Sequence, residues 1–386
     1  MKNNKELLSD RDVSSRLRRW MRLGFAAAVV LAVLTALRDS SSSSLVYLGS
    51  FLGLFGLLVV IVPRIASRKL SRIRPGHVVV LFCSLVLGLL FAEAGIRVFW
   101  PFYFVSARDE RTLMHRYDEN LGWFPKENSH YTFTGSRLIN IAHNSRGFRD
   151  TEEKDAHKPG IIFLGDSFLW GYDVEAQERF TDKLQARHPE LTVYNFGVSG
   201  YGTDQEFLLL KQQKIELLTP ACVFLVFCTE NDAADNCGNC LHSAYYKPYF
   251  TCTSNSLQLH GIPVPRGERA FRASHPILCQ SHLVSVLAHV YFELTARRIT
   301  TQDDPTSCIL LAMSDYLAQR GIPLGVGFTS TCSNLQTTLG LAGVPCIDLS
   351  TTNRYGGGGQ HWTPAGHDEV CKQVERFLAT LHEYER

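Results

Sequence analysis

The chain has 386 residues, of which 45% are hydrophobic, and its formal net charge is +2. This length allows one large folded domain and an additional segment. The small net charge does not indicate a nucleic-acid or polyanion partner, and no nucleic-acid partner is predicted. The charges are unevenly distributed along the chain, however, and their distribution is informative.

Three apolar stretches occur near the amino terminus. We predict membrane-spanning helices there, at about residues 20–37, 45–63 and 78–100, because roughly 20 helical residues cross the hydrocarbon layer. The first helix requires Arg22 to extend toward the headgroups. The third requires Glu93 or Arg97 to lie at an interface or to face a neighbouring helix. A signal-peptide core is the alternative for the first stretch, because basic residues precede it.

Lys and Arg residues indicate how these helices are oriented. Several precede the first stretch: Lys2, Lys5, Arg11, Arg16, Arg18, Arg19 and Arg22. Arg38 is the only basic residue between the first and second stretches. The connection between the second and third stretches contains five: Arg64, Arg68, Lys69, Arg72 and Arg74. Basic segments tend to stay in the cytoplasm. We therefore predict a multi-pass protein of the cell membrane with a cytoplasmic amino terminus, in which everything after Trp100 is periplasmic or extracellular.

Ten of the 11 cysteines follow residue 220, and an even number suits a domain in an oxidising compartment. The run Cys237-Gly-Asn-Cys240 is interpreted either as a short disulfide or as two free thiols. It is also half of a possible zinc site, but the sequence offers no second such pair and no matching His pair. No metal or other cofactor is predicted.

Beyond the membrane region, assigned to residues 1–104, residues 105–157 are interpreted as an irregular lead-in. A catalytic domain is assigned to residues 158–386, where strand-like and helix-like segments alternate. The predicted strands are 161–164, 191–196, 221–227, 323–328 and 344–349. The predicted helices are 175–187, 203–218, 281–298, 307–320 and 364–382, with a loop-like segment over 236–280. This alternation predicts an α/β fold with a parallel sheet between two helical layers.

Ligands in such sheets bind at the carboxyl ends of the strands, and four motifs occur there. Gly165-Asp166-Ser167 follows the first strand, where a tight strand-to-helix turn exposes a nucleophilic hydroxyl; an ordinary turn is the alternative. A Gly-rich run through Gly200 follows the second strand and offers a backbone amide to an oxyanion, or serves only as a connection. Asn231 follows the third strand, as an oxyanion donor or within an Asx turn. His361 precedes the last helix, as a general base or as a structural residue.

Taken together, Gly-Asp-Ser, a Gly-rich strand end, Asn-Asp and a late His resemble the SGNH hydrolases, also called GDSL-type esterases and lipases. The resemblance covers about residues 112–386. It implies a flavodoxin-like α/β/α sandwich and metal-free ester hydrolysis through an acyl-enzyme. In that family pattern Ser167 is the nucleophile and His361 the general base. The Ser167 amide, Gly200 and Asn231 form the oxyanion hole.

One part of the family pattern is missing. Members usually carry an Asp two or three residues before the His, and here Gly359 and Gly358 stand at those positions. Three interpretations remain open. A backbone carbonyl orients His361 in a Ser–His dyad, a distant acid such as Asp348 substitutes, or the domain is catalytically weak or inactive.

The leading hypothesis is a membrane-anchored esterase that hydrolyses acyl or acetyl esters outside the cytoplasm. The expected partner is an ester-bearing small molecule, lipid or glycan, and this expectation rests on the predicted location alone. An O-acyltransferase of envelope polysaccharide and an inactive SGNH-fold binding protein are the alternatives.

Overall fold

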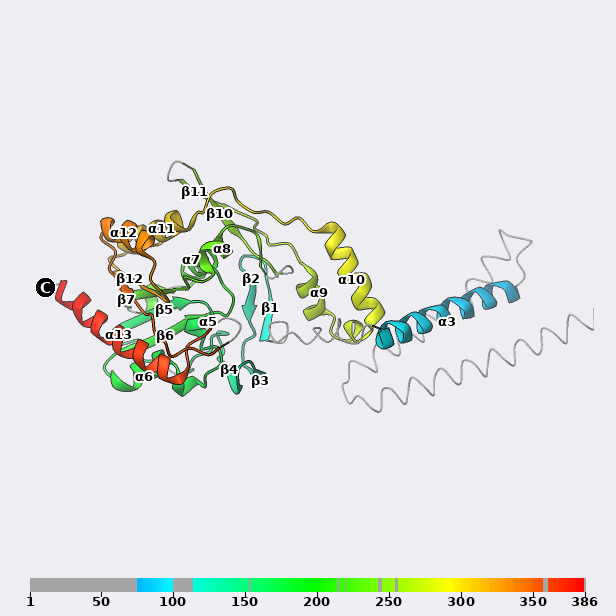
Figure 1. Ribbon diagram of the computed structural model, residues 1–386, viewed down its shortest axis with the longest axis horizontal. Helices are drawn as coiled ribbons and strands as arrows, with labels where there is room; N and C mark the ends of the chain where they lie inside the picture. Colours follow the sequence, from blue (N-terminus) through cyan, green and yellow to red (C-terminus); the bar gives the residue numbers. More distant parts are fainter. Residues whose placement is uncertain are drawn as a thin grey trace, which may run out of the picture. The chain divides into compact units, whose positions relative to one another are not determined.

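The computed structural model describes residues 75–99, 114–152, 154–213, 215–218, 220–241, 245–253, 256–356 and 360–384. The first two predicted membrane helices lie outside these residues. The chain divides into two compact units, drawn in Figure 1: Met1–Phe104 with Ile277–Ser285, and Val105–Pro276 with Val286–Arg386.

In the first unit, helix α3 (Pro75–Phe99) corresponds to the third predicted span. Its segment Val79–Phe99 is, among the described residues, the one helix long and apolar enough to cross a membrane. A short helical turn, η4 (Leu278–Gln280), belongs to the same unit and leads into helix α10 (His282–Thr295), which continues into the second unit.

A five-stranded parallel sheet forms the centre of the second unit. Its strands are β5 (Gly160–Gly165), β6 (Thr192–Gly197), β7 (Pro220–Phe227), β12 (Leu324–Phe328) and β13 (Cys346–Asp348). They lie in the order β13-β12-β7-β5-β6, with all neighbours parallel. This is the flavodoxin-like order of doubly wound sheets, in which the strand order reverses between the first and third strands, here β5 and β7. The predicted fold class is confirmed.

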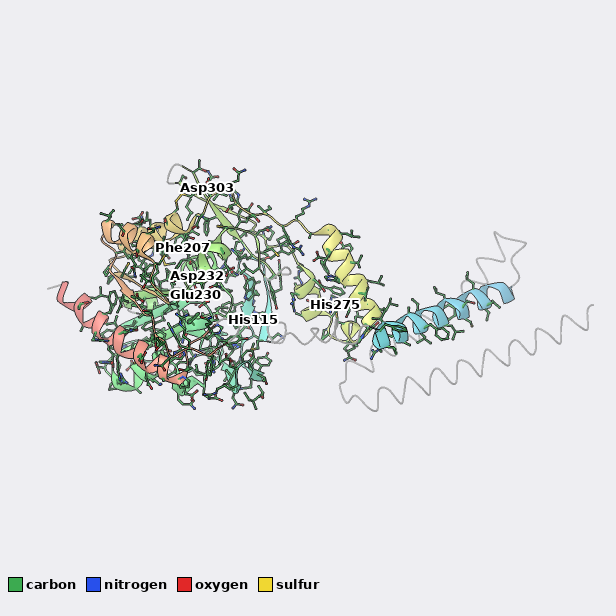
Figure 2. The ribbon with its side chains drawn as sticks, in the orientation of Figure 1. His115, Phe207, Glu230, Asp232, His275 and Asp303 are labelled. Atoms are coloured by element: carbon green, nitrogen blue, oxygen red, sulfur yellow. A yellow bond between two sulfur atoms is a disulfide. The ribbon has the colours of Figure 1, made fainter. Side chains whose placement is uncertain are left out.

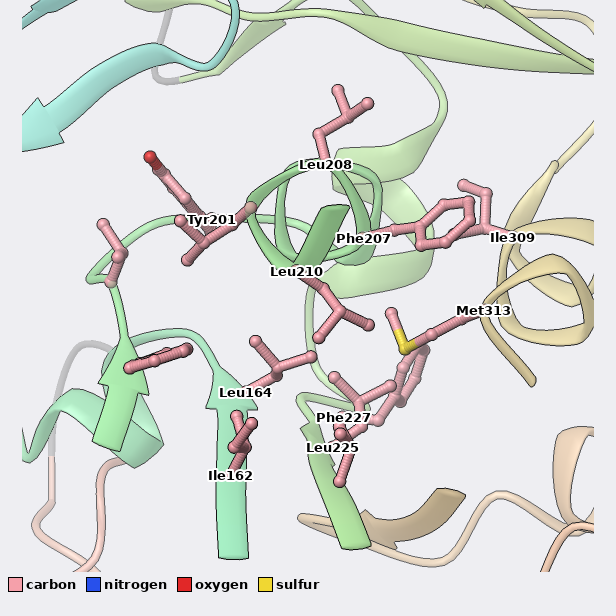
Figure 3. Close-up of a cluster of buried hydrophobic side chains, with 14 of the residues drawn as sticks. Ile162, Leu164, Tyr201, Phe207, Leu208, Leu210, Leu225, Phe227, Ile309 and Met313 are labelled. Carbon is pink, nitrogen blue, oxygen red and sulfur yellow. The ribbon is translucent and has the colours of Figure 1, made fainter. Parts of the chain in front are cut away.

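Helices cover both faces of the sheet. They are α6 (Phe180–Arg187) and α13 (Pro364–Tyr384) on one face, and α7 (Thr203–Gln212), α11 (Thr306–Ala318) and α12 (Ser333–Leu341) on the other. Because side chains alternate along a strand, Phe163 packs with α6 and α13, whereas Leu164 packs with α7 and α11. Figure 3 shows the second cluster, in which Leu164 and Leu225 of the strands face Leu210 of α7 and Met313 of α11. Helix α12 had not been predicted.

Some predicted helices are shorter or interrupted in the structure. The segment predicted as one helix over 203–218 is α7 followed by the separate turn η3 (Ile215–Leu218). The segment over 175–187 is the turn η2 (Ala176–Glu178) followed by α6, because Arg179 has an extended backbone.

The prediction that the lead-in is irregular was wrong. Its described part forms two antiparallel hairpins, β1 (His115–Asp118) with β2 (Gly122–Pro125), and β3 (Ser129–Thr134) with β4 (Leu138–His143). The first hairpin turns because the Asp118 carboxylate accepts hydrogen bonds from the Asn120 and Leu121 amides, each at 3.0 Å. In β4 exposed and buried residues alternate, which is the pattern of a half-buried strand.

The segment 236–280 is likewise more ordered than predicted. It contains β8 (Cys240–Leu241), β9 (Tyr245–Tyr246), β10 (Tyr249–Thr253), β11 (Ser256–His260) and helix α9 (Glu268–Ser274). A disulfide joins Cys252 of β10 to Cys308 of α11. Cys237 and Cys240 are free thiols, so the disulfide interpretation of that pair was wrong. Cys237 caps helix α8 (Asp232–Asn236), where its thiol donates to the Ala233 carbonyl, whereas Cys240 begins a strand.

Candidate active site

Ser167 is the first residue of the short helix α5 (Ser167–Trp170), immediately beyond the buried strand β5. Asp166 caps this helix, since its carboxylate accepts a hydrogen bond from the Phe168 amide at 2.9 Å. Asp166 and Phe168 are buried, whereas Ser167 between them is partly exposed. The turn therefore presents the Ser167 hydroxyl at the carboxyl end of β5, as a nucleophile requires.

The structure brings His361 to this serine. The distance from His361 Nε2 to Ser167 Oγ is 2.8 Å, and the His361 side chain comes from the segment before α13. Asp166 Oδ2 lies 3.1 Å from the same Ser167 Oγ. A hydroxyl has one proton, so Ser167 donates either to the imidazole or to the carboxylate at any moment. The first arrangement is the one required for general-base catalysis.

Aromatic rings hold the His361 imidazole. The Tyr172 ring stacks on it with a centroid separation of 4.4 Å and an interplanar angle of 21°, and the Phe168 ring lies 4.9 Å away. The backbone is fixed as well, because the Tyr355 amide donates to the His361 carbonyl at 2.8 Å. The next residue, Trp362, is fully buried against Phe168. The ring plane of His361 is therefore set by residues on both sides of the site.

A second histidine close by in the sequence, His367, is a structural residue. It is buried, and its Nδ1 accepts a hydrogen bond from the Phe180 amide at 3.3 Å. Burial, followed by the nearby positive charge of Lys183, lowers the pKa of His367 well below its ordinary value. His367 is neutral and oriented toward the core rather than toward the nucleophile.

A buried arginine fixes the backbone that follows Ser167. Arg149, in the lead-in, donates to the carbonyls of Gly171 at 2.6 Å and Val174 at 2.7 Å, and to those of Trp170 and Asn140 at 3.2 Å. The carbonyls of Trp170, Gly171 and Val174 flank Tyr172, the residue that stacks on His361. The sequence did not predict a role for Arg149.

Two further buried side chains secure the same turn. Arg179 donates to the carbonyls of Arg149 and Trp170, and Asn195 of β6 donates to the Leu169 carbonyl at 3.1 Å. Gly171 closes α5 in the left-handed conformation, with φ of +87°, and a Cβ there would lie 2.4 Å from the Arg179 side chain. The end of α5 is thus determined by hydrogen bonds and by close packing.

Gly200 lies three residues beyond the end of β6, in the turn that follows this strand. The Val198 amide donates to the Gly165 carbonyl at 3.0 Å, which joins this turn to the end of β5. Gly200 has φ of +82°, a conformation that favours glycine. The lead-in supports the turn from outside, because the Tyr201 hydroxyl donates to the Trp123 carbonyl at 2.5 Å. The role of Gly200 as an oxyanion donor stays a prediction.

Asn231 follows β7 and precedes α8. Its amide Nδ2 donates to Asp235 Oδ2 at 2.8 Å, which orients the carboxamide. Burial raises the pKa of Asp235 to about 6, and the hydrogen bond from Asn231 opposes that rise. The Asn231 Nδ2 group carries a second proton that this bond does not use, so the arrangement is compatible with the predicted oxyanion contact. No observation in the described residues tests that contact.

A group of buried acids lies behind the nucleophile. Asp166, Glu206 and Asp232 are all fully or almost fully buried. Burial raises the pKa of Asp166 to about 6, and burial together with the charges of neighbouring acids raises those of Glu206 and Asp232 well above the ordinary range. Potential metal-ligand atoms of Asp166, Cys228 and Asp232 lie within 4.8 Å of one another. The expectation of a metal-free site stays a prediction.

Glu230, labelled with Asp232 in Figure 2, connects the end of β7 to the segment that carries His361. The Arg354 guanidinium pairs with Glu230 Oε1 at 2.7 Å and lies over the Phe168 ring at 5.2 Å. Although burial raises the pKa of Glu230, hydrogen bonds from Thr329 and Arg354 lower it below its ordinary value. This ion pair links the end of β7 to the segment that precedes His361.

Asp348 is engaged by other residues. One carboxylate oxygen accepts from Thr331 Oγ1 at 2.6 Å and the other from the Ser350 amide at 2.8 Å. These bonds lower the pKa of Asp348, although burial opposes them. Within the part of the chain that the structure describes, no hydrogen bond or ion pair joins Asp348 to His361. Gly358 and Gly359 lie outside the described residues.

A cavity of about 460 Å³ lies away from this pair, against β3 and β4. Asn140, Arg149 and Arg179 contribute to its lining, whereas Ser167 and His361 do not. Because both arginines already bind backbone carbonyls, this cavity is not the candidate active site.

No protein-family model matches the chain. No curated protein matches it either. Among solved structures it is similar to TesA, with 11% identity and a TM-score of 0.34 over 57% of this chain and 99% of that one. A member of the lipolytic protein G-D-S-L family from Veillonella parvula has 13% identity and a TM-score of 0.32, over 56% of this chain and 96% of its own.

A catalytic mutant of Axe2, an acetylxylan esterase from Geobacillus stearothermophilus, has 11% identity and a TM-score of 0.30. That match covers 56% of this chain and 93% of the esterase. At such low identities and TM-scores, these similarities assign neither a family nor an activity to the chain.

Proposed function

We propose that this protein is a membrane-anchored serine esterase that hydrolyses carboxylic esters through an acyl-enzyme on Ser167. The observation that carries the proposal is the 2.8 Å contact between Ser167 Oγ and His361 Nε2. It lies at the edge of the sheet where the strands end, beside the position at which the strand order reverses. Ligand sites of doubly wound sheets occur at this position.

In the proposed reaction, His361 accepts the Ser167 proton as Ser167 Oγ attacks the ester carbonyl carbon. The carbonyl oxygen becomes an oxyanion, which accepts hydrogen bonds from the amides of Ser167 and Gly200 and from the Asn231 side chain. Collapse of this intermediate breaks the bond to the alcohol, which leaves with the proton from His361. A water molecule then repeats the sequence on the acyl-enzyme and releases the acid.

We favour a Ser–His dyad over a triad with Asp348. The carboxylate of Asp348 is occupied by Thr331 and Ser350, and the Tyr172 ring stacks on the imidazole of His361. Hydrolysis by a dyad is expected to be slower than hydrolysis by a complete triad, because the imidazolium that forms is less stabilised.

The proposed location follows from the chain before the catalytic domain. Helix α3 supports at least one membrane span, and the Lys and Arg distribution supports a domain outside the cytoplasm. From this location we infer acyl or acetyl esters of envelope glycans or lipids as the substrate class. A reporter fused after Trp100 is expected to be active outside the cytoplasm, and cytoplasmic activity would contradict this topology.

The test is hydrolysis of short p-nitrophenyl esters by the full-length protein in detergent. Wild type should release p-nitrophenol, and Ser167→Ala and His361→Ala should each lose about 10³-fold or more of kcat while keeping the thermal unfolding temperature. If wild type and both variants hydrolysed the esters at the same rate, the result would contradict the proposal. Release that depends on an added sugar acceptor, with the sugar becoming acylated, would replace hydrolysis by acyl transfer.

A further inference from the structure

Helix α10 has two faces that differ in their surroundings. On one face Ser285 is buried, His289 Nδ1 pairs with Glu268 of α9 at 3.0 Å, and Phe292 contacts Phe271 of α9. These three positions follow the i, i+4, i+7 spacing of a single helical face. This face, which packs on the protein, is called the inner face.

The opposite, outer face carries large apolar side chains that are exposed. They are Leu287 (60% exposed), Val290 (46%), Tyr291 (60%) and Leu294 (83%). Their spacing of i, i+3, i+4 and i+7 gathers them into one stripe. A soluble helix normally has polar residues on the face that points away from the protein, and a contiguous exposed apolar stripe indicates a contact surface.

The first turn of the same helix is bound to a membrane-spanning candidate. Glu93 of α3 accepts hydrogen bonds from Ser281 Oγ at 2.8 Å and from the amides of His282 at 3.0 Å and Leu283 at 2.8 Å. It also pairs with Arg97 at 2.7 Å. A carboxylate at the start of a helix stabilises it through these amides and through the helix dipole.

These bonds fix where α10 begins. Glu93 is six residues before Phe99, about 9 Å along the axis of α3, and a carboxylate at such a depth needs partners within the membrane or at its surface. The amides of His282 and Leu283 supply them. We therefore expect the start of α10 to lie at the membrane boundary, beside the carboxyl-terminal part of α3.

We propose that the outer face of α10 contacts the lipid bilayer as a second membrane contact, located within the second half of the chain. Lipid chains require no hydrogen-bonding complement, and among the four residues of the outer face only Tyr291 has a polar atom. Tyrosine is enriched at membrane interfaces, with its ring in the apolar region and its hydroxyl toward water. The inference depends on α3 lying in the membrane and not on the proposed esterase activity.

The test uses the full-length protein in vesicles of phosphatidylcholine with a minor share of phosphatidylglycerol. The photocrosslinker p-benzoylphenylalanine is installed at Leu287 or Leu294, and lipid adducts are quantified by mass spectrometry after illumination. Phe91 of α3, which is 75% exposed, is the positive control. Leu341 of α12, an exposed leucine at 87%, is the matched control outside α10.

The expected result is lipid adducts at Leu287 and Leu294 in yields comparable to Phe91, with none at Leu341. Adducts at Phe91 alone would contradict the proposal, and so would crosslinks from Leu287 or Leu294 to a second copy of the chain or to another protein. If Phe91 formed no lipid adducts either, α3 would not lie in the membrane, and the proposal would be overturned because it depends on that location. A Leu287→Glu/Leu294→Glu variant should abolish lipid adducts formed from position 291 and keep those at Phe91.

Discussion

The two halves of the candidate catalytic pair are supported in different ways. On the serine side, Arg149, Arg179 and Asn195 bind the backbone carbonyls that follow Ser167, and all three are buried. On the histidine side, the imidazole of His361 is positioned by ring contacts and by its own backbone.

The comparison shows that different kinds of contact hold the two catalytic candidates in place. The position of the nucleophile is fixed by the hydrogen bonds of the core, so it tolerates little change. On the base, an aromatic contact such as that of Tyr172 with His361 contributes about 0.5–1.5 kcal/mol. Substitutions on the serine side should therefore act mainly through stability, and substitutions on the histidine side mainly through turnover.

The largest effect is expected for Arg149→Met. Several carbonyls around Gly171 would lose a buried charged donor, and we expect the free energy of unfolding to fall by about 3–5 kcal/mol. Thermal and denaturant unfolding of the full chain in detergent measure it. Arg146→Met is the matched control, because Arg146 is exposed, and it should cost less than about 1 kcal/mol. Equal losses in the two variants would show that Arg149 does not hold the serine side.

The next largest effect is the pH dependence of stability that Asp235 causes. The Asp235 carboxylate accepts a hydrogen bond from Asn231. Burial raises the pKa of Asp235 to about 6 from 3.8, so the folded protein binds this proton more tightly than the unfolded chain does. The associated stability is present below pH 3.8 and is lost as pH rises through about 6.

Relative to Asp235→Asn, wild type should therefore lose up to about 3 kcal/mol of unfolding free energy between about pH 4 and pH 7. Denaturant unfolding at both pH values measures this difference. Asp303→Asn, at an exposed position, should show no such trend relative to wild type. A constant difference between wild type and Asp235→Asn across this range would contradict the raised pKa.

A smaller effect is expected on the histidine side for Tyr172→Leu. Loss of the ring that stacks on His361 should lower kcat by about tenfold or less, with KM and the unfolding temperature nearly unchanged. Tyr172→Phe keeps the ring and should stay within about threefold of wild type. If Tyr172→Phe were as slow as Tyr172→Leu, the hydroxyl rather than the stacking would position the imidazole.

The smallest effect is expected for Asp348→Asn. Because Thr331 and Ser350 occupy its carboxylate, turnover of p-nitrophenyl esters should change by less than about threefold. Loss of a catalytic triad acid costs about 10⁴-fold in kcat in the serine proteases. A loss approaching that size, with the fold intact, would make Asp348 the substitute acid and would overturn the dyad.

Much of the fold could be predicted from the sequence because strands of a parallel sheet are buried on both faces. β5 and β7 therefore appear in the sequence as short apolar runs. The lead-in hairpins and the short strands β8 and β9 could not be recognised in the same way. β1 has a single fully buried residue, His115, and β8 and β9 have two residues each. Such strands form because their partners and the domain surface hold them, which local sequence does not encode.

For the site, Ser167 could be predicted because it follows a recognisable strand. His361 could be predicted because it precedes a recognisable helix at the same edge of the sheet. Arg149 and Tyr172 could not, since their roles depend on contacts across the fold. Arg149 reaches carbonyls more than 20 residues away, and Tyr172 meets a histidine near the other end of the domain.

The central claim is that His361 activates Ser167. Labelling of the full-length protein with a fluorophosphonate, mapped by mass spectrometry, tests it most directly. We predict covalent label on Ser167, no label in Ser167→Ala, and a labelling rate reduced at least about tenfold in His361→Ala. A wild-type protein that keeps its fold and takes no label at Ser167, or a His361→Ala variant labelled as fast as wild type, would contradict the account.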